Sequence, residues 1–323
     1  FSNLKAFPQL QLIHDEARSW FNSTHKKFHF IQMSMIDTWA ATAAGAFSLS
    51  ENGLYTLEGW ESFIKALEHD GIFTVSRWYA VNDTQETARM LSLAVSALIK
   101  QGAGDPSKHL FLAHGGAVAT LIVSKRPLPL EELQVLHQIA DSKGFGILYS
   151  PLSPSSVPLL DKIANAPSMD YIAALAEPEI LDFTAATDDR PFFFNQLKLS
   201  RIFDYLQRDK QGVLLGNLNA TLTLALILVL ATIAAILAIV IPLHRTIKGI
   251  NRKYLASGSL YFMLIGFGFM FAEIALLQKL GLFLGHPIYG LSVGLAGLIF
   301  SSGLGSYLTH REILHTPFGF VIW

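Results

Sequence analysis

Polar residues follow a short, largely apolar run near the start of the chain. The run, Phe28 to Met35 (FHFIQMSM), has the length and composition of one buried strand. Ser34, Asp37 and Thr38 lie at or just beyond its end. In open α/β sheets ligands bind beyond the carboxyl ends of the strands, so we expect chemistry here. Alternatively, Asp37 only caps a turn, because Asp is common in turns and at helix starts.

The elements around this run predict an α/β sheet. Strand and helix patterns alternate up to Trp78, which is typical of parallel strands joined by right-handed crossovers. Gly115-Gly116 then joins two β segments as a hairpin. The predicted strands are 10–14, 28–35, 71–78, 109–113, 117–125 and 146–149, and the predicted helices are 16–21, 54–70, 84–101, 129–143 and 159–176, after a loop at 150–158.

An aromatic segment, TDDRPFFF (187–194), follows these elements. It could be a packed segment that anchors the domain near a membrane surface, where aromatic rings are favoured. It could also form one wall of a substrate pocket. The residue types leave both interpretations open.

The last third of the chain predicts three membrane-spanning helices, at about 220–243, 255–277 and 287–308, since about 20 apolar residues cross a bilayer. Glycines at four-residue spacing in the third would let helices approach closely. Glu273 and Gln278 are polar residues within or near the second. A carboxylate at this depth is costly, so Glu273 is either a proton or cation site or a neutral helix–helix contact. Basic residues flank the first span on both sides, so orientation stays open.

Composition excludes several other classes of protein. The net charge is −1 and no basic run exceeds two residues, which gives no sign of nucleic-acid binding. There is no cysteine, so disulfides and thiolate metal sites are absent. The histidines are scattered, and we expect no metal site. The chain starts at Phe1 and ends in FGFVIW, so we expect an internal piece of a longer protein.

Five blocks of sequence carry a resemblance to known proteins: 14–21, 28–60, 69–78, 187–194 and 266–295. Together they resemble the spermidine-synthase-like family, and more closely the bacterial membrane proteins that fuse such a domain to transmembrane helices. The resemblance implies a partial Rossmann-like, class I methyltransferase-like sheet, mostly parallel with an antiparallel hairpin, followed by an all-α transmembrane bundle. It implies an α/β domain at 1–150, a flap and membrane-proximal segment at 151–210, membrane helices at 219–323, and the bacterial inner membrane.

The same resemblance implies a cofactor, S-adenosylmethionine or its decarboxylated form. Asp15 matches the residue that contacts adenine, and Ser34 occupies the pocket position where aminopropyltransferases carry a catalytic carboxylate. Serine is not basic near neutral pH, so Asp37, which matches a second acidic position, would be the base. The glycine-rich turn and the ribose-binding acid would lie upstream of Asp15. We therefore expect the site to be incomplete in this chain and to bind S-adenosylmethionine poorly by itself.

Three classes of function follow from these observations. The first is a membrane-bound aminopropyl- or methyltransferase acting on an amine or another small acceptor, with Trp39 and Tyr55 lining the acceptor site because aromatic faces hold cations. Both rings could equally belong to the core. The second is a solute transporter or sensor built around Glu273, with the sheet as an appendage. The third is a scaffold that keeps the fold without the activity. The expected partners are the lipid bilayer and a small-molecule substrate.

Overall fold

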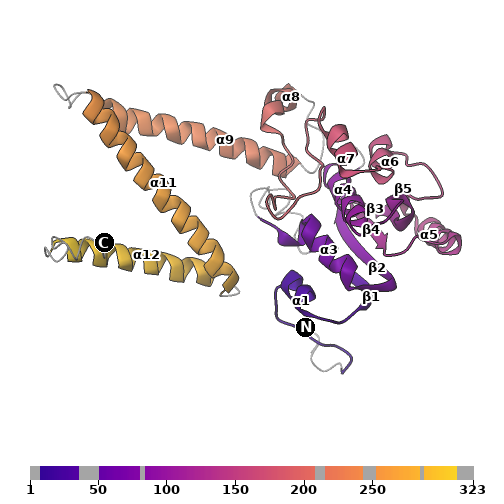
Figure 1. Ribbon diagram of the computed structural model, residues 1–323. Helices are drawn as coiled ribbons and strands as arrows, with labels where there is room; N and C mark the ends of the chain where they lie inside the picture. Colours follow the sequence, from indigo (N-terminus) through magenta and orange to yellow (C-terminus); the bar gives the residue numbers. More distant parts are fainter. Residues whose placement is uncertain are drawn as a thin grey trace. The chain divides into compact units, whose positions relative to one another are not determined.

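The structure is a computed structural model, and it describes residues 8–35, 51–80, 84–207, 215–242, 252–283 and 287–310. The chain divides into two compact units (Figure 1). One unit, residues 17–233, holds a five-stranded mixed sheet with helices packed on it. The other joins residues 234–323 to the first 16 residues and contains long apolar helices.

The sheet has the strand order β1-β2-β4-β3-β5. Only β1 and β2 pair in parallel among the described strands, and the other three pairs are antiparallel. The expectation of a mostly parallel sheet is therefore wrong. The physical reason is the predicted hairpin, whose tight turn at Gly116 makes β4 antiparallel to β3. Because β4 lies between β3 and β2, it also contributes an antiparallel pair with β2. The strands are β1 (Phe28–Met33), β2 (Leu67–Trp78), β3 (Leu110–Gly115), β4 (Val118–Ser124) and β5 (Gly146–Tyr149).

The parallel pair is built around a helical crossover. Helix α3 (Leu57–Ala66) connects β1 to β2, and Ile31 pairs with Phe73 in the ladder. The predicted helix end at Asp70-Gly71 is wrong, because the helix stops at Ala66 and residues 67–70 already belong to β2. Pairing of Phe28 with Leu67 overrides the local helical pattern. Gly71 fits here because an added Cβ would lie 2.8 Å from the Phe28 carbonyl oxygen.

The helices cover the two faces of the sheet unequally. The larger core includes the wholly buried Trp60 of α3, Phe73 of β2 and Leu91 of α4. On the other face Leu133 of α5 packs with Phe111 of β3. Successive strand residues point to opposite faces, which is why neighbours in β3 belong to different cores. The helices of this unit are α1 (Ala17–Ser23), α3, α4 (Gln85–Lys100), α5 (Leu130–Lys143), α6 (Pro158–Ala164), α7 (Met169–Ala176) and α8 (Ile202–Gln207), with short 3-10 turns η2 (Gly53–Tyr55), η3 (Pro106–His109) and η4 (Leu199–Arg201).

Two further sequence expectations are corrected. The predicted strand at 10–14 has no regular secondary structure, and Leu10, Leu12 and Ile13 are exposed. A single extended segment without a partner strand makes no ladder of hydrogen bonds. The predicted helix at 159–176 is two helices, α6 and α7, because Pro167 interrupts it.

Three helices among the described residues are long and apolar enough to cross a membrane, as predicted. Their apolar windows are Asn219–Ala238, Ala256–Leu277 and Gly290–Tyr307. Helix α9 (Leu215–Ala235) continues as a π-helical stretch, Ile236–Val240, just before Pro242, whose ring and missing N–H disturb regular helix bonding.

Helices α11 (Arg252–Phe283) and α12 (Pro287–His310) pack against each other. A Cβ added to Gly294 would lie 2.4 Å from Cδ2 of Leu277, so this glycine permits the close approach that its spacing predicted. An added Cβ at Gly297, Gly303 or Gly305 would meet no atom within 4 Å.

Candidate functional site

Polar side chains gather at the start of helix α3, near the carboxyl end of β1. Thr56 and Glu58 of this helix start, with Arg18 and Asp188, form a cluster that we call the polar corner. The helix follows β1 in a crossover, so its first turn lies at the edge where α/β sheets bind ligands. Thr56 caps it, because its Oγ1 accepts the backbone N–H of Gly59 at 3.2 Å and donates to the carbonyl of Gly53 at 3.0 Å. A Cβ on Gly59 would lie 2.6 Å from that same carbonyl oxygen, so the tight turn requires glycine.

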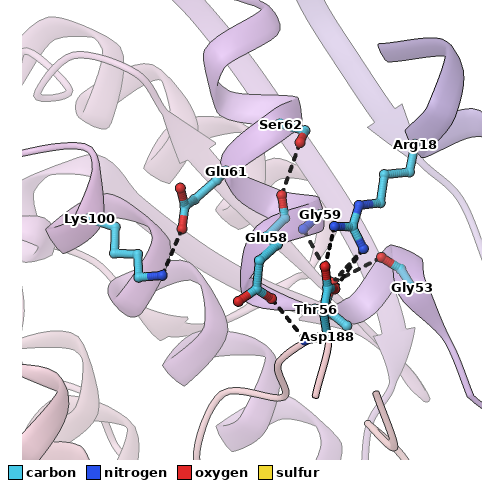
Figure 2. Close-up of polar contacts among 9 residues, drawn as sticks. All are labelled: Arg18, Gly53, Thr56, Glu58, Gly59, Glu61, Ser62, Lys100 and Asp188. Carbon is cyan, nitrogen blue, oxygen red and sulfur yellow. Dashed lines mark hydrogen bonds and ion pairs between the residues drawn. The ribbon is translucent and has the colours of Figure 1, made fainter. Parts of the chain in front are cut away.

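An ion pair joins this corner to two distant segments (Figure 2). Nη1 of Arg18, on α1, donates to Oδ1 of Asp188 at 2.6 Å, and Nη2 pairs with the second carboxylate oxygen. Nη1 also lies 3.4 Å from Oγ1 of Thr56. The backbone N–H of Asp188 donates to Oε2 of Glu58 at 2.9 Å. The guanidinium of Arg18 holds the pKa of Asp188 below its usual range. Such a bidentate pair fixes both side chains in direction as well as distance.

A buried ion pair supports the corner from within the core. Arg77 of β2 donates through Nε and Nη2 to Oε2 of Glu86 at 3.0 and 2.7 Å. Their side chains are 0% and 3% exposed. Nη1 of Arg77 also donates to the Tyr55 hydroxyl at 3.3 Å, and the guanidinium carbon lies 4.7 Å from the ring centroid of Phe194. The charge is therefore neutralised and enclosed by aromatic rings.

A second buried guanidinium, that of Arg89, forms hydrogen bonds with the backbone in and beside the aromatic segment 187–194. Arg89 of α4 donates to the carbonyl oxygens of Thr184, Phe192, Phe193 and Asn195 at 2.9–3.1 Å. Burial lowers the pKa of Arg89 to about 10, so the group stays cationic at neutral pH. Phe193 and Phe194 are buried in the larger core. These contacts support the interpretation of TDDRPFFF as a packed segment.

The predicted site residues fall in different places. Asp15 is exposed, and its Oδ1 accepts the backbone N–H of Glu16 at 2.8 Å. Ser34 is exposed directly after β1. Tyr55 is 1% exposed and contacts Phe193 with ring centroids 4.7 Å apart. Asp37 and Trp39 lie outside the described residues. The catalytic, cofactor and substrate roles given to these residues stay predictions.

The predicted intramembrane residues both belong to α11. Glu273 is half-buried within the apolar window and lies one turn before Leu277, which packs on Gly294. Residues four apart share a helix face, so Glu273 lies on or near the face toward α12. The side chain of Gln278 is outside the described part of this helix. Among the described residues, no three His, Asp or Glu side chains gather as metal ligands would.

Sequence reasoning did not single out the residues that the structure joins at α3. Arg18 and Asp188 are 170 residues apart, and no local spacing links them. Asp188 belongs to the TDDRPFFF motif, which was noticed, but the motif contains no signal for its partner. The buried pair Arg77–Glu86 had one available signal: an arginine in the β-rich run 71–78 needs a partner if that strand is buried.

Together these observations define a class: an α/β protein with a mixed five-stranded sheet, joined to helices that can span a membrane. No protein-family model matches the chain, and no curated protein matches it in sequence.

Proposed function

We propose that this protein is a membrane-bound transferase that uses S-adenosylmethionine or its decarboxylated form and acts on an amine acceptor. The observation that supports it most is the β1–α3–β2 crossover. In this crossover Ser34 directly follows β1, and α3 leads back to the parallel strand β2, an arrangement that in other open α/β sheets carries ligands at the carboxyl ends of the strands. The antiparallel hairpin beside β2 is the second feature that the resemblance implied.

The proposed reaction is a nucleophilic displacement at carbon. The cofactor, when bound, would supply an electrophilic methyl or propyl carbon on a sulfonium sulfur; the acceptor nitrogen would bond to that carbon, and the electron pair of the broken carbon–sulfur bond would leave with sulfur as a neutral thioether. The acceptor nitrogen loses its proton to the Asp37 carboxylate, since Ser34 cannot take it. Asp15 would contact the adenine ring and Trp39 would border the acceptor, whereas the ring of Tyr55 is buried against Phe193 and fits the core interpretation better.

The test uses the polypeptide encoded by the native gene, reconstituted in lipid nanodiscs. It is supplied with labelled S-adenosylmethionine or the labelled decarboxylated form and a panel of polyamines. We expect label transfer to one acceptor class, and we expect Asp37→Asn to slow turnover by about 10²–10⁴-fold. The matched control is Asp189→Asn, an exposed aspartate beside Asp188, which should leave turnover unchanged. Absence of transfer with both cofactors would reject the proposal, and unchanged turnover in Asp37→Asn would remove that residue from the mechanism.

A transporter or sensor is the second candidate, and Glu273 is the observation that favours it. Its carboxylate lies within an apolar helix, on or near the face toward α12, where a proton or cation could bind. Glu273→Gln removes the titratable group and keeps the side-chain volume. Uptake or export in membrane vesicles that is lost in this variant would support the candidate, whereas unchanged flux would count against it.

A further inference from the structure

Two strongly exposed apolar side chains lie shortly before the first membrane helix. Leu199 is 67% exposed and Phe203 is 74% exposed, the highest values among the large apolar side chains described between residues 17 and 207. They belong to the consecutive turns η4 and α8 and are four residues apart in the sequence. Two large apolar side chains this exposed and this near in the sequence indicate a surface that contacts something apolar.

The neighbouring contacts place this surface close to where the chain enters the bilayer. Leu197 is buried and packs with Leu222, which lies in the first turns of the apolar window Asn219–Ala238. Leu199 is two residues after Leu197, so the Cα atoms of the two residues are at most about 7 Å apart. The exposed surface is thus beside the residue that touches the start of a membrane span.

The charges near Leu199 and Phe203 suit an anionic surface. The side chain of Arg201 is 41% exposed and pairs with Asp204 at 3.3 Å. The sequence from residue 199 to residue 210 contains three basic and two acidic residues, a net charge of +1. Basic residues beside a span are attracted to anionic lipid headgroups. Lys198 does not take part in this surface, because its Nζ donates to the carbonyl of Glu177 at 3.1 Å, at the end of α7.

We propose that the exposed side chains of Leu199 and Phe203, with Arg201 between them in the sequence, form an interfacial anchor that lies in the headgroup region of an anionic bilayer. Leu199 and Phe203 insert at the boundary between headgroups and acyl chains, and Arg201 contacts lipid phosphate. The bilayer is the favoured occupant because the adjoining span keeps it within reach at all times, whereas a protein partner must be bound from solution. The proposal is independent of the transferase activity.

The absence of cysteine makes this surface easy to label. Full chains that carry a single cysteine, Phe203→Cys or Ile139→Cys, are coupled to an environment-sensitive fluorophore and placed in nanodiscs. Ile139 is the matched control, a 48% exposed apolar residue on α5. The nanodiscs contain equal parts of phosphatidylglycerol and phosphatidylcholine, or phosphatidylcholine alone, with and without doxyl-labelled lipid. Both positions are exposed, so neither substitution should affect folding, which a melting curve checks.

We expect emission from position 203 to shift to shorter wavelength and to be quenched by doxyl lipid, and emission from position 139 to do neither. Arg201→Gln should reduce the quenching at position 203 in the anionic nanodiscs and have little effect in the neutral ones. Water-like, unquenched emission from position 203 would overturn the proposal. So would a blue shift without doxyl quenching, because that result would show a protein contact.

Discussion

At the residue scale, the pair Arg18–Asp188 predicts an acid-dependent stability. The pKa of Asp188 is lowered from its ordinary 3.8 in the folded protein, so its contribution is present above that pH and is lost as the pH falls through the folded value. The two side chains are 22% and 43% exposed, and solvent limits the pair to about 1 kcal/mol or less. We expect Asp188→Asn to unfold at lower denaturant than wild type near neutral pH, and this difference to vanish in acid.

The matched control for that prediction is Asp189→Asn. Asp189 is the adjacent aspartate and is exposed. Tryptophan fluorescence can follow unfolding, because four of the five tryptophans precede the membrane helices. A difference between wild type and Asp188→Asn that grows toward acid pH would contradict the assignment.

The buried pair predicts a larger effect. Glu86→Gln removes the Glu86 charge that lies against the wholly buried guanidinium of Arg77, and we expect a loss of about 3–5 kcal/mol in the free energy of unfolding. The surface pair Arg126–Glu132 supplies the control, because Glu132→Gln should cost about 1 kcal/mol or less. Denaturant titration of both variants measures the difference. Equal losses would show that burial does not set the cost.

At the element scale, the β1–β2 pair depends on one glycine. An added Cβ at Gly71 would meet the Phe28 carbonyl oxygen at 2.8 Å and the Glu68 nitrogen at 3.0 Å, both backbone atoms that cannot turn away. We expect Gly71→Ala to destabilise the sheet unit by about 1–3 kcal/mol. Gly104→Ala is the control, because its Cβ would meet nothing within 4 Å. Denaturant midpoints that match for the two variants would argue against this packing.

The helix pair α11–α12 allows a parallel test in the membrane. A β-branched side chain in Gly294→Ile would strike Leu277 and Leu280, whereas Gly303→Ile meets open space. We expect the first variant to increase the distance between spin labels on α11 and α12, measured by dipolar spectroscopy in nanodiscs. The second should leave the distance as in wild type. An unchanged distance in Gly294→Ile would show that the helices do not pack at this glycine.

The sequence predicted many elements because their signals are local. The helices α4 and α5, the hairpin and β5 follow from spacing and turn residues close together in the chain. Strand order, the start of β2 at Leu67 and the pairing of Arg18 with Asp188 depend on contacts across the fold. At 10–14 the β pattern was present but the partner strand was not, and pattern alone does not form a strand. Of the candidate site, Ser34 could be placed at the end of β1, but the polar corner could not be anticipated.

At the scale of the whole molecule, the number of membrane crossings decides whether the α/β unit and the segment after α12 lie on the same side of the bilayer. If each of the three candidate helices among the described residues crosses the bilayer, we expect the α/β unit and the segment after α12 to lie on opposite sides, whichever side each occupies. The basic residues on both flanks of the first span do not decide the direction by themselves. The relation between the two ends can therefore be tested without knowing the orientation.

Single-cysteine accessibility in sealed membrane vesicles of both orientations tests the central claim, an α/β unit tethered by three membrane spans. The cysteines are introduced by Lys162→Cys in α6, Phe267→Cys in α11 and Glu312→Cys beyond α12. A membrane-impermeant maleimide should label positions 162 and 312 from opposite sides and position 267 from neither. Labelling of 162 and 312 from the same side, or of 267 in intact vesicles, would contradict the account.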